Sequence, residues 1–174
     1  MEIRALRASD DRSRFRSGED DLDRFFHRFA GQNQFRHHLG VTYVAVEEQQ
    51  ILGFVTVAPA QIEGDDVPIR LRNKVPRYPL PVLRLARLAV DESAQAQGIG
   101  RQLLRFAMEL ATKMADDYGC VGIVVDAKAG AIAFYTQFGF LPVAAVEGLS
   151  DVRPQQTPMF LSLRAIKAAG GPPR

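Results

Sequence analysis

Cysteine and long apolar runs are both scarce in this chain of 174 residues. The one cysteine, Cys120, excludes a disulfide framework and favours a reducing cytosol. Its apolar context, GCVGIVVDA, indicates a buried structural thiol, with a catalytic nucleophile as the alternative. No apolar run approaches the ~20 residues of a membrane helix, and the polar start MEIRALRASDD lacks a signal peptide's apolar region. We therefore expect a cytoplasmic protein without membrane association.

Acidic residues are missing from residues 69–87, although the net charge of the whole chain is only +2. The basic residues of this stretch are Arg70, Arg72, Lys74, Arg77, Arg84 and Arg87. Clustered cations attract phosphates. The stretch is compatible with a solvated rim, a site for one small phosphorylated ligand, or a nucleic-acid surface.

The chain shows no internal repeat and no low-complexity linker, so we predict one domain over residues 1–166. Glycines and prolines in residues 167–174 predict a flexible tail. Strands are expected at 2–6, 42–47, 51–60, 82–90, 121–125, 140–143 and 159–163. Helices are expected from about 22 to 30, 100 to 118 and 130 to 138. Alternating strands and helices in the second half predict an α/β or α+β domain around a central sheet.

The first expected helix has an apolar stripe. Its members recur at helical spacing, and they are Leu22, Phe25, Phe26, Phe29 and Ala30. One face of this helix is therefore expected to be apolar.

A glycine turn, QAQGIGRQLL, follows the strand expected at 82–90 and opens a long helix. Free N–H groups at a helix N-terminus form an anion site, and glycine lets the backbone approach a phosphate closely. The turn is not a P-loop, because no Lys-Ser/Thr pair follows the glycines. It also lacks the third glycine of the dinucleotide fingerprint, because position 103 is leucine. The Q-x-x-G-x-G spacing alone is equally compatible with a structural turn.

The order of the surrounding segments is more specific. LARLAVD, the glycine turn, a long helix, VGIVVDA and AIAFYTQFGF follow one another. This series resembles the Gcn5-related N-acetyltransferase (GNAT) superfamily over roughly residues 40–145. The resemblance implies the GNAT fold, a mixed central sheet with splayed parallel strands at 82–90 and 121–125. It also implies that acetyl-CoA is the co-substrate, and we expect no metal.

The same resemblance implies the positions of the coenzyme site. Main-chain groups of Leu88, Ala89 and Val90 would hold the pantetheine arm and thioester as an added strand. The pyrophosphate would lie on the turn formed by Gln95, Ala96, Gln97, Gly98, Ile99, Gly100 and Arg101.

Acetyl transfer to an amine needs an oxyanion stabiliser and an acid for the departing thiolate. The resemblance implies that Tyr135 is this acid and that a main-chain N–H near Val90 is the oxyanion donor. Helical spacing turns Tyr135 about 100° from Phe134 and Phe138, which favours a role outside the core. No general base stands out. The candidates are Asp126, His37, His38 and Asp91, each of which also fits a structural or solvated role.

One branch of the superfamily is similar beyond the coenzyme site. FRSGEDDLDRFF, TYV and YPLPVLRLARLAVD resemble the toxins that acetylate the α-amine of aminoacyl-tRNA. This resemblance implies that the basic residues of 69–87 contact tRNA, that a ribbon-helix-helix antitoxin is the partner, and that the chain forms a homodimer. An ester-linked α-amine is less basic than a lysine amine, so a missing general base is tolerable.

The chain also departs from that branch. Ser17 stands where the toxins often have cysteine, and Lys128-Ala129-Gly130 replaces a polar pair after VDA. The segment after Phe140 is longer than a minimal toxin needs. Two alternatives therefore stay open: an acetyltransferase for a small-molecule amine or protein lysine, and a non-catalytic acyl-CoA-binding module.

Overall fold

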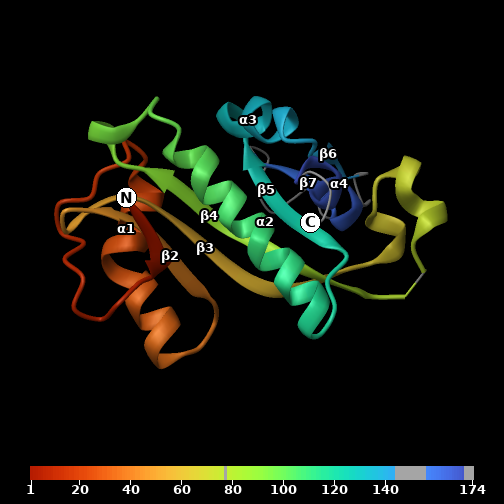
Figure 1. Ribbon diagram of the computed structural model, residues 1–174, viewed down its shortest axis with the longest axis horizontal. Helices are drawn as coiled ribbons and strands as arrows, with labels where there is room; N and C mark the ends of the chain where they lie inside the picture. Colours follow the sequence, from red (N-terminus) through yellow and green to blue (C-terminus); the bar gives the residue numbers. More distant parts are fainter. Residues whose placement is uncertain (77, 144–155, 171–174) are drawn as a thin grey trace. The chain divides into compact units, whose positions relative to one another are not determined.

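The computed structural model describes residues 1–76, 78–143 and 156–170 (Figure 1). Its strands are β1 (Glu2–Ala5), β2 (Val41–Glu47), β3 (Gln50–Ile62), β4 (Leu80–Val90), β5 (Gly122–Lys128), β6 (Leu141–Pro142) and β7 (Gln156–Ser162). They form one mixed sheet in the order β1-β2-β3-β4-β5-β7-β6, and helices flank it. The predicted fold class is confirmed. The splay of the two parallel strands stays a prediction.

The helical segments differ in type. The α-helices are α1 (Asp20–Arg24), α2 (Ile99–Asp117), α3 (Ile132–Gln137) and α4 (Leu163–Ala169). Two π-helical segments, η1 (Phe25–Phe29) and η2 (Gln32–Arg36), continue the chain after α1. Short 3₁₀ segments are η3 (Gly64–Asp66), η4 (Ile69–Lys74), η5 (Glu92–Ala94) and η6 (Ala129–Ala131). Within the described residues no helix is long and apolar enough to cross a membrane.

The chain forms two compact units, and β3, β4 and α2 contribute residues to both. Unit 1 contains residues 1–58 and 85–109, and unit 2 contains residues 59–84 and 110–174. The single domain predicted for residues 1–166 stays a prediction. The tail boundary predicted at 167 falls inside α4, which continues to Ala169 and has Gly170 as its C-cap, with the Gly170 N–H donating to Ile166 O. The rest of the predicted tail, 171–174, lies outside the described residues.

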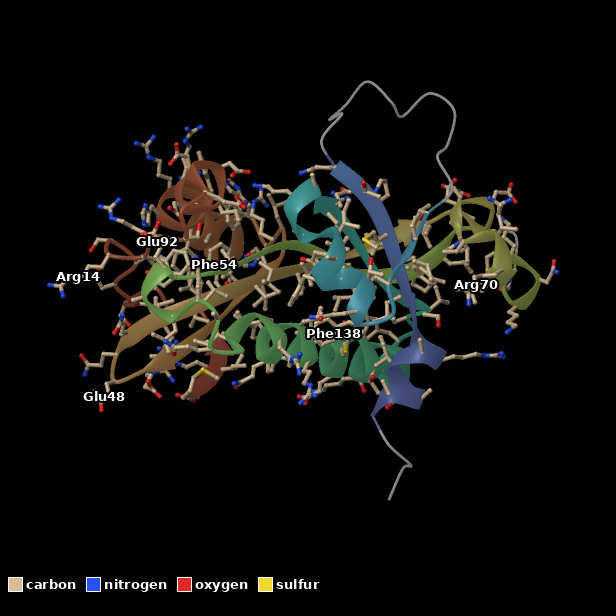
Figure 2. The ribbon with its side chains drawn as sticks, turned by 90° about the horizontal axis from the view of Figure 1, so that it is seen from above. Arg14, Glu48, Phe54, Arg70, Glu92 and Phe138 are labelled. Carbon is tan, nitrogen blue, oxygen red and sulfur yellow. The ribbon has the colours of Figure 1, made fainter. Side chains whose placement is uncertain are left out.

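In unit 1, helical segments pack on both faces of the sheet. Successive residues of a strand point to opposite faces, so neighbouring residues of β3 contact different layers. Phe54 on β3 stacks on Phe26 of η1, with ring centroids 4.4 Å apart. Figure 2 labels Phe54 within this core. The neighbouring Gly53 faces α2 instead, because a Cβ built there would lie 3.0 Å from Leu103 and 3.1 Å from Ile99. The layer on the Phe54 side of the sheet contains Phe15, Phe25 and Phe26, which pack against the strands.

The π-helical bonding changes the predicted stripe. Ala30 donates its N–H to Phe25 O, five residues earlier, so the segment turns less per residue than an α-helix. Phe25, Phe26 and Ala30 are buried as expected, but Phe29 is 44% exposed. Phe29 therefore departs from the single apolar face that helical spacing predicts.

Unit 2 is built on the antiparallel pairing of β5 with β7, which runs from Gly122↔Ser162 to Lys128↔Gln156. Its core contains buried residues of β3, β4 and β7, together with Val67 of the η3–η4 connection. The N–H of Val121, just before β5, donates to Pro81 O of β4 at 2.8 Å. These contacts fix β5 between two neighbours, as its apolar sequence predicts.

Candidate active site

The turn after β4 is held by the carboxylate of Asp91, the residue that caps η5. Its Oδ1 accepts hydrogen bonds from Ser93 N at 2.9 Å and Ser93 Oγ at 2.7 Å. Its Oδ2 accepts one from Arg16 N at 3.0 Å. Burial by itself would raise the pKa of Asp91, but these three donors outweigh it and hold the pKa below its usual range. Asp91 is therefore an ionised structural cap, which accounts for one of the four candidate bases.

The glycine turn leads directly into α2. Ala96 and Gly98 both have positive φ, at 63° and 82°, so two residues of the turn adopt a left-handed conformation before the helix begins at Ile99. The first helical bond joins Gln102 N to Gly98 O at 3.1 Å, so the amides of the first turn precede the helical ladder. A Cβ at Gly98 would meet no atom within 4 Å. Open space beside first-turn amides is what a phosphate needs, and the turn therefore fits a coenzyme pyrophosphate.

Two of the predicted coenzyme contacts have their side chains engaged elsewhere. Nε2 of Gln95 donates to Ser17 O at 2.9 Å and to Val90 O at 3.1 Å. The side chain of Ile99 is buried in the core of unit 1. Ala96, Gln97, Gly98 and Arg101 are exposed on the turn. The side chain of Gln95 thus supports the turn, and main-chain groups remain for the anion.

The predicted pantetheine edge is β4. Asp91 donates its N–H to Leu52 O of β3 at 2.8 Å. Because backbone groups of alternate strand residues point the same way, the groups of Ala89 also face β3. Those of Leu88 and Val90 face the opposite edge. Of the three predicted residues, Leu88 and Val90 are therefore the ones whose main chain is directed away from β3.

Tyr135 is the buried residue of α3, at 5% exposure. Its ring makes edge contacts with Phe134 and Phe140, each with centroids 5.2 Å apart. Phe134 and Phe138 are only partly buried, so the expectation that helical spacing turns Tyr135 away from the core was wrong. Burial raises the pKa of the Tyr135 phenol, which therefore keeps its proton at neutral pH.

The remaining base candidates have partners or surface positions. Oδ2 of Asp126 accepts a hydrogen bond from Nη2 of Arg84 at 2.7 Å. His37 Nε2 lies 3.3 Å from Gln32 Nε2, and His38 is exposed with a φ of 53°. Within residues 1–76, 78–143 and 156–170 no group of three potential ligands forms a metal site.

The predicted acceptor residues lie in three different environments. Arg70, Arg72 and Lys74 share η4, where Nε of Arg72 donates to Val67 O at 3.1 Å. Arg70 is exposed on this segment (Figure 2). Arg84 pairs with Asp126, as described above. In unit 1, the guanidinium of Arg87 lies 3.9 Å from the ring centroid of Phe25. Arg77 lies outside the described residues.

The sequence reasoning missed the role of residues 15–18. Arg16 donates to Asp91 and accepts from Glu92 N at 2.8 Å, and Ser17 O accepts from Gln95. The one local signal was Gly18, whose φ of 93° requires glycine. These partners are about 75 residues away in the chain, so no spacing in the sequence could reveal them.

Known proteins match this chain closely. The profile of the acetyltransferase (GNAT) domain matches residues 38–142. The tRNA-acetylating toxin of Mycobacterium tuberculosis is 36% identical over 140 residues, which are 79% of this chain and 82% of the toxin. An uncharacterized N-acetyltransferase of Escherichia coli, YhbS, is 29% identical over 54% of this chain and 44% of its own length.

Solved structures extend the likeness to the fold. AtaT complexed with acetyl-methionyl-tRNAfMet is similar with a TM-score of 0.84 and 26% identity, over 98% of this chain and 99% of AtaT. AtaTR bound with acetyl-CoA is similar with a TM-score of 0.78 and 27% identity, over 98% of both chains. Together with the glycine turn at the start of α2, these matches assign the family. The chain belongs to the GNAT family of acetyltransferases.

Proposed function

We propose that this chain is a toxin that transfers an acetyl group from acetyl-CoA to the α-amine of aminoacyl-tRNA and so blocks translation. The observation that carries the proposal is the likeness to tRNA-acetylating toxins over most of the chain. It includes 36% identity to the M. tuberculosis toxin and a TM-score of 0.84 to AtaT complexed with acetyl-methionyl-tRNAfMet. The enzyme class, an acetyl-CoA-dependent N-acetyltransferase, agrees with the matched domain.

Acetyl-CoA supplies the acetyl group as an activated thioester. The first-turn amides of α2, with Gly98 and Gly100, would bind its pyrophosphate, and Arg101 would add a positive charge at the edge of the turn. The main chain of Leu88 and Val90 would hold the pantetheine arm, because their groups face away from β3. This edge of β4 would therefore hold the thioester end of acetyl-CoA.

The N–H of Val90 is the proposed oxyanion donor, since it points to the same edge as the pantetheine groups. Tyr135 is the proposed acid, which gives its phenolic proton to the departing sulfur. A phenol is protonated at neutral pH, and burial raises the pKa of Tyr135 further, so the proton is present when the sulfur departs. Among the residues that the structure describes, no side chain is clearly suited to be a base, because Asp91 caps η5 and Asp126 is paired. An α-amine of low pKa needs no strong base.

The acceptor surface is proposed to include η4. Arg70 and Lys74 are exposed there and can neutralise tRNA phosphates, which provide most non-specific affinity. Arg84 and Arg87 belong to the same proposal, but each is already engaged, by Asp126 and by the Phe25 ring. We expect these two to contribute less than Arg70 and Lys74.

Partners are proposed by the same likeness. A tyrosine-to-phenylalanine variant of AtaT is bound to the C-terminus of the antitoxin AtaR in one similar structure, at 25% identity. We propose that this chain also binds an antitoxin, of the ribbon-helix-helix type, and that it acts as a homodimer in the cytoplasm. Sedimentation of the purified chain tests the dimer, since a monomer at all concentrations contradicts it.

The test of the function is transfer of labelled acetyl from acetyl-CoA to bulk charged tRNA, with deacylated tRNA as control. Label on charged tRNA alone supports the proposal. Label on neither, with acetyl-CoA still bound, contradicts it and favours a small-molecule amine or protein lysine as acceptor. Absence of acetyl-CoA binding would refute the coenzyme site itself.

A further inference from the structure

Residues 15–18, which we term the supporting segment, are joined to the turn after β4 by hydrogen bonds from three of their main-chain groups. The N–H of Arg16 donates to Asp91 Oδ2 at 3.0 Å, and the carbonyl of Arg16 accepts from Glu92 N at 2.8 Å. The carbonyl of Ser17 accepts from Gln95 Nε2 at 2.9 Å. All of these groups belong to unit 1.

The supporting segment is itself firmly held. The Phe15 ring is 2% exposed and packs against Phe26 and Phe54, at centroid distances of 4.9 and 5.4 Å. Ser17 donates twice to Asp23 Oδ1, from its N–H at 2.9 Å and its hydroxyl at 2.6 Å. These contacts anchor the segment in the core and at the start of the helical layer.

Gly18 completes the contact with the turn. A Cβ there would lie 3.1 Å from Glu92 Oε1, and the φ of 93° already disfavours any other residue. Figure 2 labels Glu92 at the turn that this segment supports. A side chain at position 18 would therefore have to displace the carboxylate of Glu92 as well as adopt an unfavourable backbone conformation.

The turn needs such support because its own conformation is costly. Ala96 is a non-glycine residue with a φ of 63°, in the left-handed region that L-residues rarely adopt. A backbone of this kind persists only where its surroundings determine it. Within the turn, Ser93 donates twice to Asp91 Oδ1, at 2.9 and 2.7 Å, whereas Gln97 Nε2 reaches Ser93 O only at 3.4 Å. Further short contacts reach the turn from residues 15–18 and from Val90 at the end of β4.

We infer that the supporting segment positions the coenzyme turn, and that Gln95 is the positioning residue that joins the two. Gln95 bridges Ser17 O and Val90 O, and so ties the segment to both the turn and the end of β4. The inference rests on the proposed coenzyme site. The side chain of Gln95 would act by fixing the backbone of residues 90–98, and it would not contact the anion itself.

The consequence is selective for the pyrophosphate. A turn whose amides are held in place before binding loses less freedom when the anion binds, so preorganisation strengthens binding. A thioester without a pyrophosphate gains nothing from it. Acetyl-pantetheine, which ends before the pyrophosphate, is therefore the probe that separates positioning of the turn from general damage.

The experiment measures kcat/KM for acetyl-CoA and for acetyl-pantetheine with the same charged tRNA. The Gln95→Met variant keeps the side chain's length and removes both donated hydrogen bonds. We expect the ratio of the two kcat/KM values to fall about tenfold, since two neutral hydrogen bonds are lost. Gly18→Ala, which acts from the other side of the contact, should lower the same ratio.

Gln34→Met is the matched control. Gln34 also bridges two main-chain groups of unit 1, because it donates to Leu6 O at 3.1 Å and accepts from Thr42 N at 2.9 Å. Neither of these partners belongs to the turn after β4. Its variant should lower the melting temperature without changing the ratio.

The outcomes are distinct. An unchanged ratio in Gln95→Met overturns the inference, even if Gly18→Ala fails to fold. An equal fall in both kcat/KM values also overturns it, because that result indicates general damage. If the unaltered chain shows no preference for acetyl-CoA over acetyl-pantetheine, the proposed coenzyme turn fails and the inference fails with it.

Discussion

Arg84 on β4 donates from Nη2 to Oδ2 of Asp126 on β5 at 2.7 Å, and both side chains are partly exposed. A carboxylate this close offsets the positive charge that Arg84 presents to an RNA phosphate. Arg70 forms no ion pair within the part of the chain that the structure describes. The two arginines should therefore differ in their contribution to tRNA binding.

We predict that Arg70→Ala lowers the slope of log affinity against log salt concentration by about 1, as loss of one phosphate contact does. Arg84→Ala should lower it by less. Fluorescence anisotropy of labelled charged tRNA across a salt series measures both slopes. A larger loss for Arg84→Ala would contradict the screening by Asp126, and loss of acetyl-CoA binding in Arg70→Ala would contradict its place on the acceptor surface.

Gly98→Ala should separate coenzyme binding from folding. The added methyl group meets no atom within 4 Å, but it projects into the space proposed for the pyrophosphate. The φ of 82° adds a strain of about 1 kcal/mol. We expect the dissociation constant for coenzyme A to rise more than about tenfold in calorimetry, with a small fall in melting temperature.

Gly119→Ala is the control for that variant, because Gly119 also has positive φ, at 105°, and has only Pro81 nearby, at 3.8 Å. It should show the same small loss of stability and unchanged affinity for coenzyme A. Equal affinities in both variants would show that Gly98 does not border the anion.

Tyr135→Phe should abolish most turnover while the fold persists. The variant keeps the ring contacts with Phe134 and Phe140 and removes only the hydroxyl. We expect kcat to fall about 10²- to 10⁴-fold, the usual contribution of a general acid, with unchanged affinity for acetyl-CoA. Tyr118→Phe, at a residue that is 76% exposed, is the control. Full turnover in Tyr135→Phe would remove Tyr135 as the acid.

Local patterns predicted most of the elements. The hairpin of β2 and β3 turns at Glu48 and Gln49, whose φ values of 49° and 69° match the two-residue turn that right-handed strands prefer. The glycine turn and the start of α2 were likewise visible, because a turn and the helix after it depend on adjacent residues. The prediction succeeded where cause and effect lie close together in the chain.

The errors came from long-range packing. Helical spacing separates Tyr135 from Phe134, but it does not say which of them the sheet will cover. The partners of Gln95 include Ser17, which is 78 residues away, so its supporting role depends on the folded chain. The shift to π-helical bonding at Phe25 is also invisible to a period of 3.6 residues, and this is why Phe29 was misplaced.

The free energy of unfolding should fall at acid pH because the Asp10 carboxylate becomes protonated. Its carboxylate accepts from Arg4 Nη1 at 2.9 Å and Nη2 at 2.8 Å, and these bonds hold the pKa of Asp10 below its usual value against the opposing effect of burial. The folded pKa therefore lies below the unfolded one, about 3.9. The contribution is complete above the unfolded pKa and is lost as the pH falls through the folded pKa.

Urea unfolding at pH 7 and near pH 3 measures this effect. Asp10→Asn should cost about 2 kcal/mol at pH 7, the size of hydrogen bonds to a charged group, and less near pH 3. Asp65→Asn, at an exposed position, should behave as the unaltered chain does at both pH values. A cost for Asp10→Asn that does not change with pH would contradict the role of the Arg4 pair.

Among the described glycines of unit 2, Gly122 is the position where an added methyl group should be most destabilising. A Cβ at Gly122 would clash with Leu161 O and would lie 2.8 Å from the Phe160 ring, where β5 pairs with β7. The strands must separate or Phe160 must leave its place in the core, and overpacking of this kind costs about 1–3 kcal/mol or more. Gly130→Ala, where nothing lies within 4 Å, is the matched control and should unfold at the same urea concentration as the unaltered chain. If the two variants unfold together, the close contact of β5 with β7 at Gly122 does not exist in solution.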